Sequence, residues 1–318
     1  MAKSSARQER SRVNEDGLLT LLQVSLNPVK GLQEMLGNDF MRYAFMAGTS
    51  MAVLGGLVGY FVVLRRLAFA GEALSHVAFA AALGAVLLGF EPLAGMFVIT
   101  VAVALGMGSF ADQARSNDIA VGTVLTWVLG VGALFLSIYT SSASGGNNGQ
   151  IGVNVLFGSI LGVQLQQAQE AVGIGLVALV VLLLIIRPLL FATLDPTVAQ
   201  VRGVPVRLVG IAFIGLVAVT VTEAVQVVGA LLVLALLVMP AATAQRWTSR
   251  PFIALVLSAA LAVILTWSGL ILGYYKPYPV SFFITTLAFG SYAGTLGVQY
   301  AWSRWSRRPA GHVQIAGP

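Results

Sequence analysis

A succession of apolar runs, separated by short polar or arginine-bearing stretches, fills most of this chain. A helix needs about 20 mostly apolar residues to cross the hydrocarbon core of a bilayer. Two runs that meet at Thr222 and Glu223 are short, so we expect either two thin spans or discontinuous helices there. The runs lie at about 40–64, 67–90, 93–111, 119–139, 168–191, 208–222, 225–244, 252–272 and 279–302. The pattern predicts an all-α fold, a polytopic membrane helical bundle with about eight or nine transmembrane helices.

Composition supports a membrane protein and excludes several kinds of site. Only 9% of the residues are charged, compared with about 25% in a typical soluble domain. The 35 glycines suit closely packed transmembrane helices, and Gly55 and Gly59 form a GxxxG pattern in the first run. The chain has no Cys, which excludes disulfides and thiolate metal sites. Its net charge of +6 does not indicate nucleic-acid binding, because the basic residues gather at the ends of the runs.

The arginines predict the orientation of the bundle. If the runs alternate in direction, all arginines after residue 60 fall on one side, which the positive-inside rule makes cytoplasmic. The opposite side then carries Glu91, the polar loop 141–150, Glu170, Glu223 and Lys276. We divide the chain into a polar tail with an interfacial amphipathic helix (1–38), a membrane domain (39–303) and a basic cytoplasmic tail (304–318).

The second run contains Glu72 and His76 four residues apart, which places both side chains on one face of a helix. Ionisable side chains at membrane depth are costly, so their presence indicates a function. A carboxylate oxygen and an imidazole nitrogen are ligands that suit Zn²⁺ or Mn²⁺. The alternative is a hydrogen-bonded pair that joins helices, which polar side chains also form in membranes. Two ligands leave a coordination shell incomplete, as a transport pathway needs if the ion is to leave again.

A short capped helix is predicted at about 194–205, on the cytoplasmic side. Asp195 is placed to cap its N-terminus, Pro196 fits the first helical position and Gly203 provides the stop. Val198, Ala199 and Arg202 lie within it. A compact helix between two spans is suited to contact a soluble partner, although an ordinary capped loop helix would have the same pattern.

Glu223 and Gln226 lie three residues apart at the predicted outer end of the short run pair. They are candidates for an outer vestibule that attracts a cation. The simpler interpretation, which we favour from sequence, is a solvated turn in which Glu223 stands near a helix start.

Four blocks together resemble the manganese/zinc-type permease family of ABC transporters. They are Val63-Leu64-Arg65-Arg66 with Gly71-Glu72-Ala73-Leu74-Ser75-His76, Leu156-Phe157-Gly158-Ser159-Ile160-Leu161, Asp195-Pro196 through Ala199 to Gly203-Val204-Pro205, and Val228-Gly229-Ala230-Leu231-Leu232 with Met239-Pro240-Ala241-Ala242-Thr243-Ala244. The blocks occur in the family's order and span about residues 40–300. One departure is that the family usually has Asp where this chain has Glu72.

The resemblance implies a transport subunit, not an enzyme, in the plasma (inner) membrane of a bacterium. It implies a homodimer that pairs with a cytoplasmic ATP-binding subunit and an extracytoplasmic metal-binding receptor. The dimer would import Zn²⁺ or Mn²⁺, held in transit by Glu72 and His76, with no permanently bound cofactor. The 194–205 helix would couple the chain to the ATPase. The chain itself has no Gly-x-x-x-x-Gly-Lys-Ser/Thr pattern, so ATP would be hydrolysed on the partner.

Other functions stay open at this stage. A permease for a metal chelate, such as a siderophore or corrinoid, would not need a carboxylate and an imidazole on one helix. A secondary cation transporter would work without an ATPase, which leaves the 194–205 helix unexplained. An intramembrane metalloprotease of the usual pattern needs two histidines on one helix, and only His76 lies in an apolar run.

Overall fold

The computed structural model describes residues 35–110, 117–141, 156–158, 160–276 and 278–306. Most of the predicted interfacial helix and the loop 142–155 lie outside these residues. Within the described part, nine long helices and two short helical elements follow one another without a strand. They are α3 (Asp39–Leu64), α4 (Ala68–Leu87), α5 (Pro92–Phe110), α6 (Asn117–Ser141), η2 (Ile160–Gly162), α8 (Leu165–Leu194), α9 (Pro196–Val201), α10 (Val206–Val228), α11 (Val233–Trp247), α12 (Pro251–Tyr275) and α13 (Val280–Ser306).

Seven of these helices are long and apolar enough to cross a membrane, and α5 has a shorter apolar stretch at Pro92–Gly108. The remaining long helix, α11, has only 15 residues and contains Pro240. At about 1.5 Å per residue it spans less than the thickness of a bilayer core. The predicted all-α membrane bundle is therefore confirmed, and the chain is a multi-span membrane protein.

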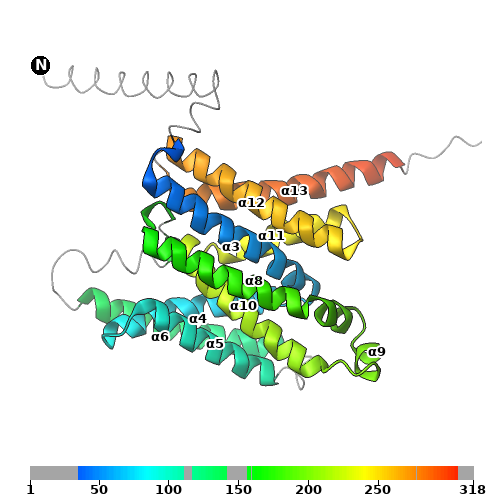
Figure 1. Cartoon of the computed structure of the whole chain (residues 1–318), viewed down its shortest axis with the longest axis horizontal. Helices are drawn as coiled ribbons and strands as arrows, with labels where there is room; N and C mark the ends of the chain where they lie inside the picture. Colours follow the sequence, from blue (N-terminus) through cyan, green and yellow to red (C-terminus); the bar gives the residue numbers. More distant parts are fainter. Residues whose placement is uncertain (1–34, 111–116, 142–155, 159, 277, 307–318) are drawn as a thin grey trace, which may run out of the picture.

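The helices lie side by side in one bundle, with α3 close to its centre (Figure 1). Helix α3 packs against α12, α11, α8 and α10, and its buried face is rich in small residues such as Gly55, Gly56 and Gly59. A Cβ at Gly59 would overlap the carbonyl oxygen of Leu237, so only glycine lets α3 and α11 approach this closely. The GxxxG pattern predicted from sequence is thus a close contact within one chain.

The chain breaks between α10 and α11 later than the sequence suggested. Helix α10 continues through Thr222 and Glu223 as far as Val228, and the break occupies 229–232. Gly229 has a φ of +94°, a conformation that glycine adopts without strain. It lies against the backbone of Gly158, whose φ is +75°, and Leu231 N–H donates to the carbonyl of Leu156 at 3.2 Å. The backbone at 156–158 therefore packs against the turn that follows α10.

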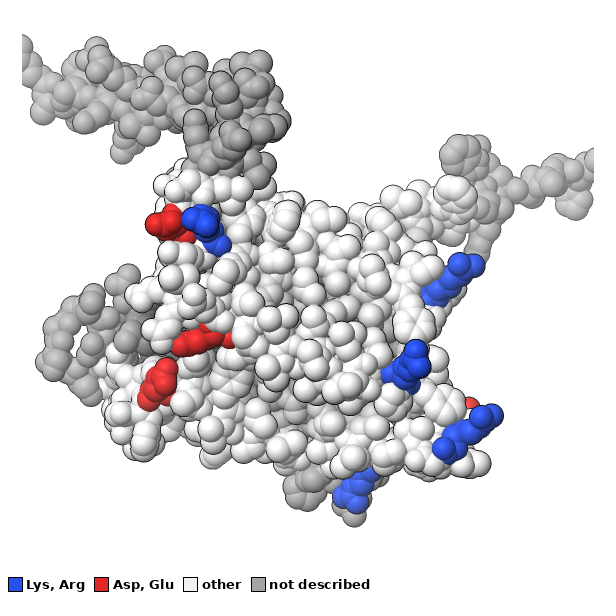
Figure 2. All heavy atoms as spheres, viewed as in Figure 1, with Lys and Arg blue, Asp and Glu red and all other residues white. Residues whose placement is uncertain are grey.

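The charges separate the two ends of the bundle, as predicted. Figure 1 shows α9, the α11–α12 turn and the last turns of α13 at one end. Basic side chains are concentrated at that end in Figure 2, whereas acidic side chains dominate the opposite end. There the Arg42 guanidinium pairs with the Asp39 carboxylate at 3.7 Å. The arginine-rich end is the cytoplasmic end by the positive-inside rule.

Candidate functional site

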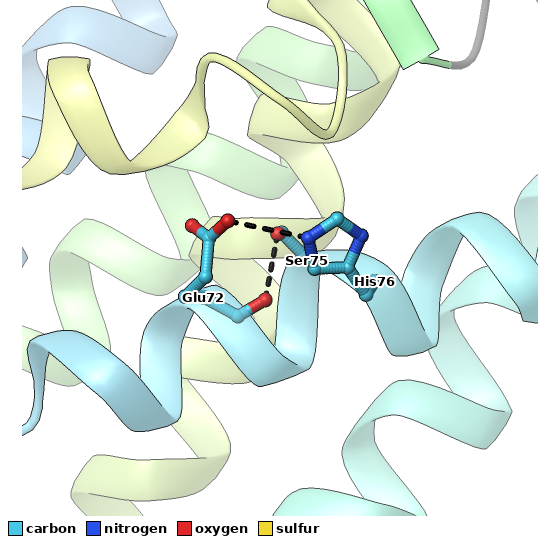
Figure 3. Close-up of polar contacts among 3 residues, drawn as sticks. All are labelled: Glu72, Ser75 and His76. Carbon is cyan, nitrogen blue, oxygen red and sulfur yellow. Dashed lines mark hydrogen bonds and ion pairs between the residues drawn. The ribbon is translucent and has the colours of Figure 1, made fainter. Parts of the chain in front are cut away.

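Glu72 and His76 face each other on one side of α4, in its first half (Figure 3). His76 Nε2 lies 3.2 Å from Glu72 Oε1, and the Ser75 hydroxyl donates to the Glu72 carbonyl at 2.8 Å. Both side chains are mostly covered, with exposed fractions of 24% for Glu72 and 11% for His76. The remaining polar atoms of the pair, Glu72 Oε2 and His76 Nδ1, are buried without a hydrogen-bond partner.

The spacing of this pair suits two ligands of a single ion. Ligands about 2.1 Å from one ion lie about 3.0 Å apart in octahedral geometry and about 3.4 Å apart in tetrahedral geometry. The observed 3.2 Å between Nε2 and Oε1 falls between these values. The second carboxylate oxygen, Glu72 Oε2, could reach the same ion, whereas His76 Nδ1 points away from it and would need another partner.

One chain supplies only part of a coordination shell. Within the residues that the structure describes, no group of three or more His, Cys, Asp or Glu side chains is close enough to hold a metal ion. The pair lies beside α11, because α4 packs against that helix and a Cβ at Gly71 would be 3.6 Å from Leu237 Cδ2. The role of the pair as metal ligands, with a shell completed by other groups, stays a prediction.

Glu223 is not in a solvated turn, so the sequence interpretation that we favoured is wrong. Its side chain is 0% exposed, in a continuous stretch of α10. The Glu223 carboxyl lies 3.3 Å from the hydroxyl of Ser50 in α3, and that hydroxyl lies 3.1 Å from the carbonyl of Ala171 in α8. Gln226 is half-buried, with an unpartnered Oε1. Sequence reasoning missed Ser50, because nothing local links residues separated by 173 positions.

The capped helix between two spans forms as predicted. Asp195 Oδ1 accepts hydrogen bonds from the backbone N–H groups of Thr197 and Val198 at 3.1 and 2.9 Å, Pro196 opens α9, and Gly203 has a φ of +80°. Arg202 follows the helix as its C-terminal cap.

The structure divides the residues of α9 into an inner and an outer group. Ala199 is fully buried, whereas Val198 and Val201 are 43% and 86% exposed. Val201, which the sequence analysis did not single out, lies three residues after Val198 on the same face. The signal that could have identified Val201 is an apolar residue on a short helix that polar residues flank.

Comparisons with known proteins agree on one family. The sequence model of the ABC 3 transport family matches residues 37–299. The manganese transport system membrane protein MntC of Halalkalibacterium halodurans is 31% identical over 241 residues, which cover 74% of this chain and 80% of that protein. The manganese import system permease protein ScaB of Streptococcus parasanguinis is 30% identical over 251 residues, 77% of this chain and 85% of that protein.

Solved structures show the same fold. The structure described as PsaBC from Streptococcus pneumoniae in complex with Fab matches with a TM-score of 0.73 and 23% identity, over 84% of this chain and 94% of the matched chain. An inward-facing conformation of a putative metal-chelate type ABC transporter matches with a TM-score of 0.61 and 14% identity, over 85% and 89% of the two chains. The fold is therefore shared with proteins of distant sequence.

Proposed function

Because the chain belongs to the ABC 3 transport family, we propose that it is the membrane-spanning subunit of an ATP-driven importer of Mn²⁺ or Zn²⁺ in the bacterial plasma membrane. The observation that supports this most strongly is the pair of Glu72 and His76 in α4. An oxygen and a nitrogen ligand lie 3.2 Å apart at membrane depth, in a chain whose relatives are named as manganese permeases.

A second copy of the chain would complete the coordination shell. In a twofold-symmetric homodimer, two copies of Glu72 and His76 offer four ligands, which is enough for a tetrahedral ion or most of an octahedral one. The partial exposure of both side chains is consistent with a pair that borders a shared passage. An ion held by flexible ligands from two protomers can be released when the protomers move apart, which alternating access requires.

Helix α9 is our candidate for the contact with a separate ATP-binding subunit. Val198 and Val201 present an apolar face at the cytoplasmic end of the bundle, and Asp195 and Gly203 fix the start and end of the helix. Arg202 is exposed beside them, where an ion pair with the partner would contribute mainly orientation. Ala199 is a poor contact residue because it is buried within the chain.

The contact role of α9 is tested by Val201→Glu with Gln200→Glu as the matched control. Both side chains are exposed on the same short helix, so both variants add the same charge at nearly the same place. Val201→Glu is expected to reduce copurification of the ATPase about tenfold, since a charge replaces an apolar contact worth about 1–2 kcal/mol. Equal behaviour of the two variants would show that the apolar face of α9 is not the contact.

On the outer side, we propose that an extracytoplasmic receptor delivers the ion. Of the two residues predicted to form an outer vestibule, we keep Gln226 in this role. It is half-buried, and its Oε1 lacks a hydrogen-bond partner. Because this oxygen is buried, the Gln226 side chain would have to turn outward to meet a hydrated cation.

A chelate permease is the main alternative, and the Glu72 and His76 pair disfavours it. The metal of a chelate is already bound by the chelator, so it would not need a carboxylate and an imidazole of the protein as ligands. The secondary-transporter alternative is disfavoured by the family and by the capped helix α9.

The test is uptake of radioactive manganese and zinc into vesicles that contain the chain with its ATPase and receptor. His76→Ala is compared with His312→Ala, the variant of the chain's other histidine. We expect ATP-dependent uptake of one or both ions by the wild type and by His312→Ala, and none by His76→Ala. Uptake by His76→Ala at the wild-type rate would make the pair structural and favour the chelate permease.

A further inference from the structure

Glu223 forms a second polar site in the interior of the bundle, away from α4. Its carboxyl links three helices, because it lies 3.3 Å from the Ser50 hydroxyl of α3, which lies 3.1 Å from the Ala171 carbonyl of α8. Glu223 is fully buried. The proposed metal pathway leaves this arrangement without an explanation.

The hydrogen atoms in this chain of contacts can be counted. A serine hydroxyl has a single hydrogen, so Ser50 can make one well-directed hydrogen bond, to either Ala171 or Glu223. The shorter contact is the one to the Ala171 carbonyl, which has no hydrogen to offer. If Ser50 donates to that carbonyl, the hydrogen between Ser50 Oγ and Glu223 Oε1 must come from Glu223, which then is a carboxylic acid.

The surroundings of Glu223 favour the same protonation state. The ion pairs among the described residues are those of Asp39 with Arg42 and of Glu72 with His76. No described Lys, Arg or His nitrogen therefore lies within 4.0 Å of the Glu223 carboxyl. Glu223 Oε2 has no hydrogen-bond partner. An ionised carboxylate without a cation or further donors is very unfavourable in an apolar interior, whereas a neutral acid needs far less compensation.

Other charged groups on the neighbouring helices are engaged elsewhere or lie near the helix ends. Glu170 of α8 accepts from Gln166 at 2.9 Å. The remaining ionisable groups on the described helices that pack against α10 are Asp39, Arg42, Tyr43 and Tyr60 of α3, Glu72 and His76 of α4, Arg187 of α8 and Arg246 of α11.

Position 175 of α8 needs a glycine for this contact to form. A Cβ at position 175 would collide with Ser50 Oγ and would lie 3.2 Å from Glu223 Oε1. The absence of a side chain at this point of α8 is therefore what allows the hydroxyl and the carboxyl to meet beneath it.

We propose that Glu223 carries a proton and is a positioning residue, whose carboxylic acid donates to Ser50 while Ser50 donates to the Ala171 carbonyl. The arrangement holds α10 against α3 and α8. Since α10 also packs against α4, it fixes one wall next to Glu72 and His76. As a neutral acid, Glu223 adds no second fixed negative charge to the bundle interior that would compete for a divalent cation.

Infrared spectroscopy of the full-length chain reconstituted in lipid tests the protonation state directly. The chain has only 12 Asp and Glu residues, so the carbonyl stretch of one protonated carboxylic acid should be resolvable in a difference spectrum at neutral pH. We expect Glu223→Gln to remove a protonated-acid band. If Glu223→Gln instead removes a carboxylate band, the proposal is overturned.

A second variant keeps the test valid if Glu223→Gln does not fold. Ser50→Ala removes the acceptor of the acid and leaves Glu223 in place, so the protonated-acid band is expected to persist and shift to higher frequency. An unshifted spectrum, or one without such a band in the wild type, would contradict the proposal. Neither result depends on metal transport, so failure here is distinguishable from failure of the proposed function.

Discussion

Glu72 and Glu223 are both glutamates inside the same bundle, and their neighbours differ. Glu72 lies next to an imidazole, is partly exposed and leaves an oxygen and a nitrogen of the pair without partners. Glu223 is sealed from solvent and meets a hydroxyl that already has a carbonyl to donate to. The comparison teaches that position in an apolar run does not assign a role to a carboxyl group. The neighbour that shares its hydrogen bond decides whether it is suited to bind a cation or to hold helices together.

The strongest way to break this comparison is to replace each carboxyl group by an amide in turn. Glu72→Gln should reduce metal uptake by at least about 100-fold, because even the outer partners of metal ligands contribute about 10–100-fold to affinity. Glu223→Gln keeps the size of the side chain and gives Ser50 an amide N–H donor, so uptake should stay within about twofold of wild type. Both variants are measured by manganese and zinc uptake in the same vesicles. Comparable losses would show that Glu223 also acts through its charge.

Two glycines beside the two carboxyls allow a comparison of packing. Gly175→Ala should destabilise the chain by about 1–3 kcal/mol, since the new methyl group collides with Ser50. Gly71→Ala, next to Glu72, should stay within about 0.5 kcal/mol of wild type, because its Cβ makes an ordinary 3.6 Å contact with Leu237. Thermal unfolding in detergent measures both. Equal stability of the two variants would mean that the contact of Ser50 with Glu223 is loose.

The smallest expected effect is a change of ion preference at Glu72. Glu72→Asp introduces the residue that is usual at this position in the family and shortens the side chain by one methylene. We expect uptake to continue, with the ratio of manganese to zinc uptake changed by about fivefold, equivalent to about 1 kcal/mol. Competition between the two ions in one uptake assay measures this ratio. A complete loss of uptake would mean that the site accepts only the longer carboxylate.

Local features of this fold could be predicted from the sequence, and long-range ones could not. The nine apolar runs anticipate the nine long helices of the described part, and Asp195, Pro196 and Gly203 anticipate α9, because spans and caps depend on neighbouring residues. The Glu72 and His76 pair follows from a spacing of four residues. The helix break was predicted too early, near residue 222, because Glu223 is a polar residue that interrupts the apolar run. Its place in α10 depends on Ser50 and Gly175, on two other helices.

The central claim is that His76 supplies a nitrogen ligand to a transported ion, and pulsed electron paramagnetic resonance tests it most directly. Mn²⁺ bound to the chain in complex with its ATPase would be measured for magnetic coupling to ¹⁴N, in the wild type, His76→Ala and His312→Ala. The account predicts imidazole nitrogen coupling in the wild type and in His312→Ala, and its loss in His76→Ala. Coupling that persists in His76→Ala, or that is absent from wild type with Mn²⁺ bound, would contradict it.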